Sequence, residues 1–190
     1  MKLQEDILKR LILTDKELIS GSLNNDLKSQ KELFDKYKDS MKSLCLRYTG
    51  NNQDAEDILQ EGFILAFGKL KNYKFEGSFE GWLRRIMINV ALKFLKRKKS
   101  IYFEDIDSFY DLKDKSEDIL SKLNADNLLD LLTKLPSGYR TVFNMYVIEG
   151  FNHKEIGEKL NIAESSSRSQ LAKSKKMLKK LITELYSDNG

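Results

Sequence analysis

Apolar residues recur three or four positions apart along most of this 190-residue chain, the spacing that gathers them on one side of an α-helix. Proline occurs once and glycine ten times, so few positions interrupt that spacing. The pattern predicts an all-α fold. The predicted helices cover residues 3–12, 15–23, 27–48, 52–71, 79–98, 126–134, 137–149, 153–160 and 164–186.

The last third of the chain predicts a helix-turn-helix. Asn152, followed three residues later by Glu155, forms a capping box, so a helix begins near His153. Gly157 leaves space for another backbone to approach closely, and Asn161 suits the left-handed turn that ends such a helix. A second helix then follows from residue 164.

This second helix combines an apolar face with a polar, basic one. The apolar seam consists of Leu171, Leu178, Ile182 and Leu185, and the other side carries Ser165, Arg168, Ser169, Ala172, Lys173 and Lys176. Short polar and basic side chains on an exposed helix can enter a major groove, where they contact base edges and phosphates. A solvated amphipathic helix gives the same pattern, so this segment alone leaves both interpretations open.

Charge is arranged in blocks, although the formal net charge is only +4. Residues 84–99 carry seven positive charges and no negative ones, whereas residues 54–61 carry four acidic side chains. Residues 100–130 contain nine acidic side chains and three lysines, a composition typical of a tether. We therefore expect one domain at 1–99, an acidic linker at 100–125 and a second domain at 126–190, with one basic and one polyanionic partner.

Cys45 is the only cysteine, so the chain has no internal disulfide, and its neighbours Leu44 and Leu46 predict a buried thiol. The N-terminal residues have charges among their apolar positions and no small-residue cleavage site, unlike a signal peptide. No stretch of about 18 uncharged apolar residues occurs, so we expect a cytoplasmic protein.

The predicted helix at 52–71 carries an acidic stripe. Asp54, Asp57 and Glu61 share one face, bordered by Gln60, and apolar residues occupy the opposite face. Such a stripe suits a solvated surface, a metal site or a dock for a basic protein surface. A metal-dependent nuclease needs carboxylates that converge from several elements, and the single histidine, His153, is distant in sequence. We therefore expect no metal site and no cofactor.

An aromatic loop with glycines, residues 72–82, leads into the basic helix. Tyr73, Phe75 and Phe79 are suited to stack on unpaired bases while cationic side chains hold the phosphates. Phe79 and Trp82 could instead anchor the loop in the core. Ser78 is placed to cap the helix that follows.

That helix carries a polar ridge. Arg85, Asn89, Lys93 and Lys96 recur at spacings of four, four and three, with an amide near the centre. The order suits hydrogen bonds to base edges, flanked by phosphate contacts.

Several of these segments resemble the extracytoplasmic-function (ECF) subfamily of bacterial sigma-70-type sigma factors. Residues 54–61, DAEDILQE, and 77–86, GSFEGWLRRI, together with Asn89, resemble region 2 of that family. Leu135-Pro136 through Tyr139-Arg140, Glu155-Ile156 and the helix from Glu164 resemble region 4. The resemblance covers nearly the whole chain, in the family's order.

The resemblance implies a non-enzymatic subunit that directs RNA polymerase to promoters and helps to open them. Core polymerase would be bound through its beta-prime clamp helices by Asp54, Asp57, Gln60 and Glu61, with the beta flap as a second contact. The single-stranded minus-ten element would be bound by Tyr73, Phe75, Ser78, Phe79, Arg85, Asn89, Lys93 and Lys96. The duplex minus-thirty-five element would be bound by Ser165, Ser166, Arg168, Ser169, Lys173 and Lys176. An anti-sigma factor would be a further partner, and no membrane insertion is implied.

The chain departs from the family in three places. Ser165-Ser166-Ser167 stands where family members commonly have Gly-Thr-Val, and Ala172 stands where they have an aromatic or basic residue. The preferred minus-thirty-five sequence therefore cannot be carried over. Residues 1–12 extend beyond the usual start of the family.

Two other functions fit parts of the pattern. A free-standing helix-turn-helix regulator accounts for the C-terminal third, but it has no need of a surface for single-stranded DNA. A nucleic-acid enzyme that uses the acidic stripe would show magnesium-dependent nuclease activity.

Overall fold

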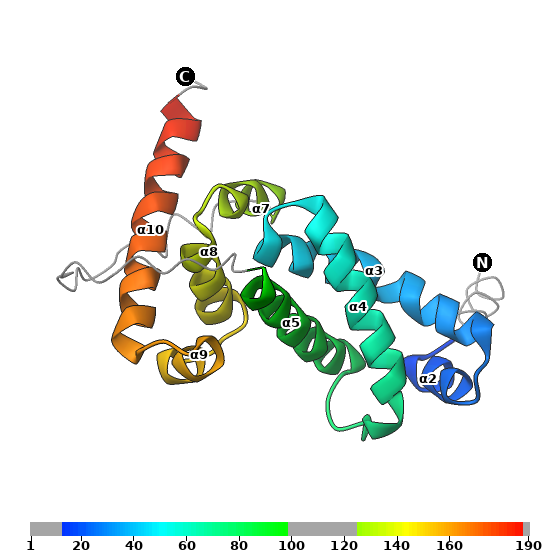
Figure 1. Ribbon diagram of the computed structural model, residues 1–190. Coiled ribbons are helices and arrows are strands. Elements are labelled where there is room, and N and C mark those ends of the chain that lie inside the picture. The colour runs from blue at the N-terminus through cyan, green and yellow to red at the C-terminus, as the bar shows by residue number, and fades with distance from the viewer. Residues whose placement is uncertain (1–12, 99–124, 188–190) are drawn as a thin grey trace. The chain divides into compact units, whose positions relative to one another are not determined.

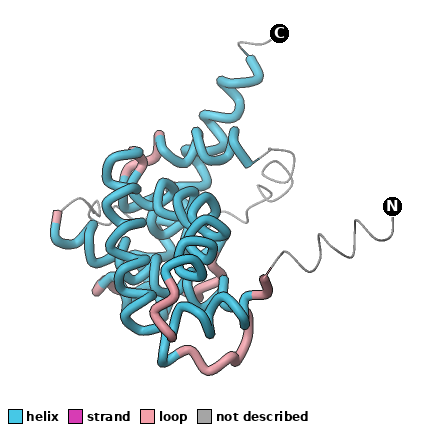
Figure 2. Tube along the Cα trace, turned by 90° about the vertical axis from the view of Figure 1, so that its right-hand side faces the viewer, coloured by secondary structure: helices cyan, strands magenta, loops and turns pink. Residues whose placement is uncertain are grey.

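A computed structural model describes residues 13–98 and 125–187 of the chain. Every regular element in these two ranges is helical, which confirms the predicted all-α class (Figures 1 and 2). The elements are α2 (Asp15–Leu23), α3 (Leu27–Thr49), α4 (Asn52–Lys69), η1 (Leu70–Asn72), α5 (Phe79–Arg97), α7 (Ala125–Thr133), α8 (Ser137–Phe143), η2 (Asn144–Ile148), α9 (His153–Leu160) and α10 (Glu164–Ser187). The predicted helix at 3–12 and the linker, apart from residue 125, lie outside the described residues.

The chain forms two compact units. The first comprises the described residues up to 44 together with 56–90. Its core contains Leu33, Met41, Ile58 and Leu83, which are fully buried. A Cβ atom added at Gly62 would overlap the side chain of Met87, so α4 and α5 approach closely only because residue 62 has no side chain.

The second unit comprises residues 45–55 and the described residues after 90. The C-terminal end of α3 therefore belongs with α8, α9 and α10. Leu132, Val142, Met145 and Ile156 are fully buried in this unit. The predicted domain boundaries at 99 and 126 flank a segment outside the described residues, and they stay predictions.

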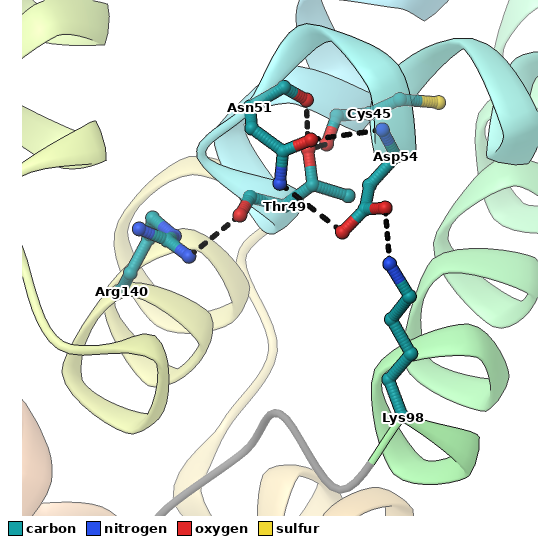
Figure 3. Close-up of polar contacts among 6 residues, drawn as sticks. All are labelled: Cys45, Thr49, Asn51, Asp54, Lys98 and Arg140. Carbon is teal, nitrogen blue, oxygen red and sulfur yellow. Dashed lines mark hydrogen bonds and ion pairs between the residues drawn. The ribbon is translucent and has the colours of Figure 1, made fainter.

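A buried arginine links four carbonyl groups in the second unit. The Arg140 guanidinium donates to the carbonyl oxygens of Tyr48 and Thr49, at 3.2 and 2.9 Å, where α3 ends. It also donates to those of Thr133 and Leu135, at 3.0 and 3.1 Å, where α7 ends. The last carbonyls of a helix have no partner within the helix, so Arg140 caps two helix ends at once. Figure 3 shows its bond to the Thr49 carbonyl.

The helix-turn-helix has the predicted caps. The Asn152 side chain accepts from the backbone N–H of Glu155 at 2.9 Å, and the Glu155 carboxylate accepts in return from the N–H of Asn152 at 2.8 Å. Asn161 adopts the left-handed conformation, with φ of 58°. A Cβ atom at Gly157 would lie 2.8 Å from the carbonyl oxygen of Ile162, which confirms that this turn requires glycine.

One predicted helix differs from the structure. Residues 137–149 were expected to form a single α-helix, but α8 ends at Phe143 and a π-helical turn, η2, continues to Ile148. The N–H of Glu149 donates to the carbonyl of Asn144, five residues back, at 2.9 Å. Nothing in hydrophobic spacing distinguishes such a widened turn from an α-helical one.

No helix within residues 13–98 or 125–187 is long and apolar enough to cross a membrane.

Candidate functional site

The exposed side of α4 presents three polar side chains followed by one large apolar one. Asp57 and Gln60 are exposed and Glu61 is half-buried. Ile64, one turn further on, is 74% exposed. Residues three, four and seven positions apart lie on one side of a helix, so these four side chains form one patch, the α4 patch.

Asp54 has partners near its own end of the helix. Its backbone N–H donates to Asn51 Oδ1 at 2.9 Å, and its carboxylate accepts from Asn51 Nδ2 at 3.1 Å and pairs with the Lys98 ammonium (Figure 3). Partial burial would by itself raise the pKa of Asp54, but the hydrogen bonds from Lys98 and Asn51 hold it below its ordinary value. Asp54 therefore stays ionised in a local network, with its side chain only 16% exposed.

Within the described residues, no group of three or more His, Cys, Asp or Glu side chains is arranged to hold a metal ion. The carboxylates of the α4 patch project from a single helix. Cys45 is buried, as predicted, and burial raises the pKa of its thiol to about 12, so the reactive thiolate is scarce at neutral pH.

The rings of the aromatic loop differ in how far they are buried. Phe79 and Tyr73 are 3% and 9% exposed, and their ring centroids lie 5.5 Å apart, edge to face. Phe75 is 51% exposed and has a φ of 60°, in the left-handed region. Its ring packs on Tyr73 with 4.9 Å between centroids, and the Tyr73 hydroxyl donates to the carbonyl of Gly77 at 2.8 Å. The buried rings thus hold the loop, and Phe75 is the ring on its surface.

Trp82 and Ser78, also in this loop, stabilise the local fold. Trp82 is half-buried, with its ring 5.4 Å from those of Tyr73 and Phe79, so the core-anchor interpretation describes all three. Ser78 accepts from the backbone N–H of Gly81 at 3.1 Å, which confirms it as the cap of α5.

All four residues of the predicted ridge on α5, Arg85, Asn89, Lys93 and Lys96, are exposed. Asn89 thus has its amide on the surface of α5. Lys96 donates from Nζ to the carbonyl oxygen of Lys159 on α9, at 2.7 Å. This carbonyl lies in the last turn of α9, where backbone acceptors lack helical partners.

On α10 the polar face is solvent-accessible. Ser165, Arg168 and Lys176 are exposed, whereas Ser166, Ser169 and Lys173 are half-buried. The Arg168 guanidinium forms an ion pair with Glu164, one turn earlier, and both side chains are about half exposed or more. Such surface pairs contribute about 0.3–0.5 kcal/mol, so a stronger acceptor can displace Glu164 at little cost.

The buried side of α10 is more polar than its predicted leucine seam. Leu171, Leu178 and Ile182 are buried as expected, together with Ser167, Gln170 and Ser174. The Ser174 hydroxyl donates to the carbonyl of Leu171 at 2.7 Å. Small serines allow α10 to lie close to its neighbours, and such positions cannot be told from exposed serines by composition alone.

His153 connects α9 to α10. Its Nδ1 lies 2.9 Å from the hydroxyl of Ser167, and its ring stacks on Tyr146 with 4.4 Å between centroids. Burial lowers the pKa of His153 from its ordinary value, and the positive charges of Arg168 and Lys175 lower it further, against an opposing effect of Glu164. The imidazole is therefore held neutral. The sequence pattern had indicated no role for His153.

Comparison with known proteins supports the sequence resemblance. Residues 33–101 match the family described as Sigma-70 region 2, and residues 125–178 match Sigma-70, region 4. The chain is 30% identical over 182 residues to the ECF RNA polymerase sigma factor SigW of Bacillus subtilis, covering 90% of this chain and 97% of that protein. This chain belongs to the ECF sigma factor family.

Two further known proteins are similar to this chain. The chain is 33% identical over 168 residues to the ECF RNA polymerase sigma factor SigE of Mycolicibacterium smegmatis, covering 85% of this chain and 65% of that protein. A solved structure of the sigma factor RpoE in complex with the anti-sigma factor NepR from Bartonella quintana aligns with a TM-score of 0.49 and 14% identity, over 83% of this chain and 98% of that one.

Exposed apolar side chains at two places on this sigma factor, one on α4 and one on η2, were not singled out from the sequence. Ile64 has the spacing of the α4 stripe, so its place on the acidic face could have been found from the helical angle alone. Tyr146 and Val147 are 39% and 44% exposed on η2, and their position depends on the π-helical turn that the sequence did not predict.

We predict that stability decreases as pH falls below 6.5, because His153 is the only histidine and its pKa is lowered in the folded state. Below that pH the His153 imidazole binds a proton more readily in the unfolded chain than in the folded one. The free energy of unfolding should therefore decrease as the pH is lowered from 7 to 5.5. Urea denaturation across this range measures it. His153→Gln should remove most of the slope, and a slope unchanged in that variant would contradict the assignment.

Proposed function

We propose that this sigma factor directs core RNA polymerase to specific promoters and helps to open them, acting in the cytoplasm and without an active site of its own. The observation that carries the proposal is the combination, on one chain with both family regions, of an acidic patch, an exposed ring beside a basic ridge, and a polar basic helix. Each suits a different partner: a protein, single-stranded DNA and duplex DNA.

The α4 patch is proposed to bind the beta-prime clamp helices of core polymerase. Exposed Ile64, one turn beyond the acidic side chains, gives an apolar anchor with charged neighbours, a combination common in protein interfaces. Asp54 is proposed to contribute mainly by shaping the start of α4, because Asn51 and Lys98 occupy its carboxylate. The beta flap is proposed as a second contact on core polymerase.

The loop and ridge are proposed to bind the single-stranded minus-ten element. Phe75 offers the accessible ring for an extruded base, while buried Tyr73 and Phe79 hold the loop in place. Arg85, Lys93 and Lys96 would hold phosphates, and the Asn89 amide would bond a base edge.

The exposed face of α10 is proposed to bind the duplex minus-thirty-five element. Arg168 can exchange its surface ion pair with Glu164 for a bidentate contact to a base. Ser165, Ser166 and Ser169 would add short hydrogen bonds, and Lys173 and Lys176 would contact phosphates.

Run-off transcription with purified core polymerase, this protein and a library of promoter fragments tests the function directly. Specific transcripts that require the protein are expected. Their absence from every fragment, together with a lack of core binding, would contradict the proposal.

Charge reversal on the α4 patch is expected to abolish binding to core polymerase. The double variant Asp57→Lys, Glu61→Lys replaces attraction with repulsion, and it should lower pull-down of core polymerase at least 10-fold, as buried interface charges commonly do. Glu56→Lys is the matched control, because Glu56 lies on the same helix but pairs with Lys42 on α3. Circular dichroism should be unchanged in both. Equal pull-down of core polymerase by wild type, the double variant and Glu56→Lys would refute the assignment.

Asn89→Ala is expected to change the preference at one minus-ten position. An amide that bonds one base edge affects only that base, and its loss should remove about 1–3 kcal/mol of discrimination there. Open-complex formation on promoters with single minus-ten substitutions measures this. A uniform loss on every promoter would point to a structural role for Asn89 instead.

Arg168→Ala and Lys173→Ala are expected to differ in kind. Arg168→Ala removes the proposed base contact, so it should relax discrimination at one minus-thirty-five position by about 1–3 kcal/mol. Lys173→Ala removes a proposed phosphate contact, so it should weaken binding to all sites and reduce the salt dependence. Binding of each variant holoenzyme to a minus-thirty-five library at several salt concentrations distinguishes them. Identical profiles would exclude base recognition by Arg168.

A further inference from the structure

A buried polar contact joins the two helices of the helix-turn-helix. His153 is the first residue of α9, and its Nδ1 lies 2.9 Å from the hydroxyl oxygen of Ser167 on α10. Ser167 is fully buried and His153 is 9% exposed. A hydrogen bond in such surroundings is stronger than one at the surface, because the local dielectric is low and water does not compete for its atoms. We call these two residues the His153–Ser167 pair.

The imidazole of the pair is fixed on two sides. The capping box of Asn152 and Glu155 holds the backbone at the start of α9, where His153 is attached. From η2, the Tyr146 ring stacks on the imidazole, with 4.4 Å between centroids and 21° between planes. A ring held at its attachment point and across its face presents Nδ1 in one direction. Ser167 therefore has a partner whose position is set before α10 packs against it.

Backbone contacts and apolar packing constrain the rotation of α10 about its own axis less than its position. The left-handed turn at Asn161 and the close approach of Gly157 to the carbonyl of Ile162 fix where α10 begins. Buried Leu171 and Leu178 keep its apolar side inward. Contacts between apolar groups have no preferred direction, so they allow small rotations. A hydrogen bond depends on both distance and angle, so the pair can fix the rotation that the leucines leave free.

The next two residues of α10 are side chains proposed to contact bases. Arg168 and Ser169 follow Ser167 at about 100° and 200° around the helix, and they are exposed and half-buried respectively. A rotation of about 10° moves a group at the outer radius of a helix, about 6 Å from the axis, by about 1 Å. Hydrogen-bond lengths vary over only about 0.5 Å. A small rotation of α10 therefore changes which base edges these side chains can reach.

We propose that the His153–Ser167 pair sets the rotation of α10 about its own axis, and thereby selects the bases that Arg168 and Ser169 reach in the minus-thirty-five element. This inference rests on the proposed function. Both members of the pair are buried, so they are positioning residues that act through side chains on the exposed face. Loss of the pair should alter discrimination at more than one base position, whereas loss of the Arg168 side chain should alter one.

Two substitutions of equal shape at Ser167 separate the hydrogen bond from packing. Ser167→Thr and Ser167→Val add the same methyl group at a buried position, and only threonine keeps the hydroxyl. Binding of each variant holoenzyme is measured on a library of single minus-thirty-five substitutions. Ser167→Val should reduce discrimination at more than one position by about 2- to 10-fold, the range of one hydrogen bond, and Ser167→Thr should keep the wild-type profile. Affinity for non-specific duplex, which depends mainly on charge, should be equal in both.

A second set of variants serves as the test if circular dichroism shows that the added methyl group prevents folding. Ser167→Ala removes the hydroxyl without adding volume, and His153→Phe keeps a ring on Tyr146 but lacks Nδ1. Both should alter the discrimination profile in the same way, and the double variant should resemble either single one. Ser174→Ala is the matched control, because buried Ser174 donates to the carbonyl of Leu171 in its own helix, at 2.7 Å. It should keep the wild-type profile.

The outcomes separate the positioning role from the proposed function. Wild-type discrimination profiles for the folded variants that lack the hydrogen bond would overturn the positioning role even if run-off transcription succeeds. An equal change in Ser174→Ala would overturn it too, because loss of any buried hydroxyl would then suffice. If wild-type holoenzyme itself shows no discrimination among minus-thirty-five sequences, the proposed role of α10 in binding DNA fails, and the positioning role fails with it.

Discussion

Burial of the Arg140 guanidinium is the constraint on which the second unit depends. A cation removed from water must have its N–H groups satisfied, and Arg140 donates to four backbone carbonyls at the ends of α3 and α7. The ends of two helices must therefore meet at one side chain. Gly50, next to it, has no Cβ because one would occupy the position of the guanidinium. The position of α8 follows from this single group.

Elements with local signals were predictable from the sequence. The caps of α9 and the turn at Asn161 depend on residues at most five apart, so their geometry is encoded within one short segment. Burial of Leu171 and Leu178 follows from helical spacing in the same way. Family resemblance added the order of the regions, which spacing alone does not give.

Features that depend on distant partners were not predictable. Asp54 pairs with Lys98, 44 residues later, and Arg140 bonds the carbonyl of Thr49, 91 residues earlier. Alternation and capping carry no information about such pairs. The aromatic loop left a choice between core and surface for each ring, and only packing separates exposed Phe75 from buried Phe79. The sequence thus indicated which segments carry the candidate surfaces, but it did not predict which side chains within each segment are exposed and which are buried.

The loop illustrates how specificity can evolve in this scaffold. Tyr73, Phe79 and Trp82 form a packed aromatic floor, and the tip from Lys74 to Glu76 projects from it with exposed side chains. Substitutions at the exposed tip leave the packed rings intact, so they should have little effect on folding. In the proposed minus-ten role of this loop, new promoter preferences would therefore accumulate one residue at a time, without the loss of stability that limits change in a protein's interior.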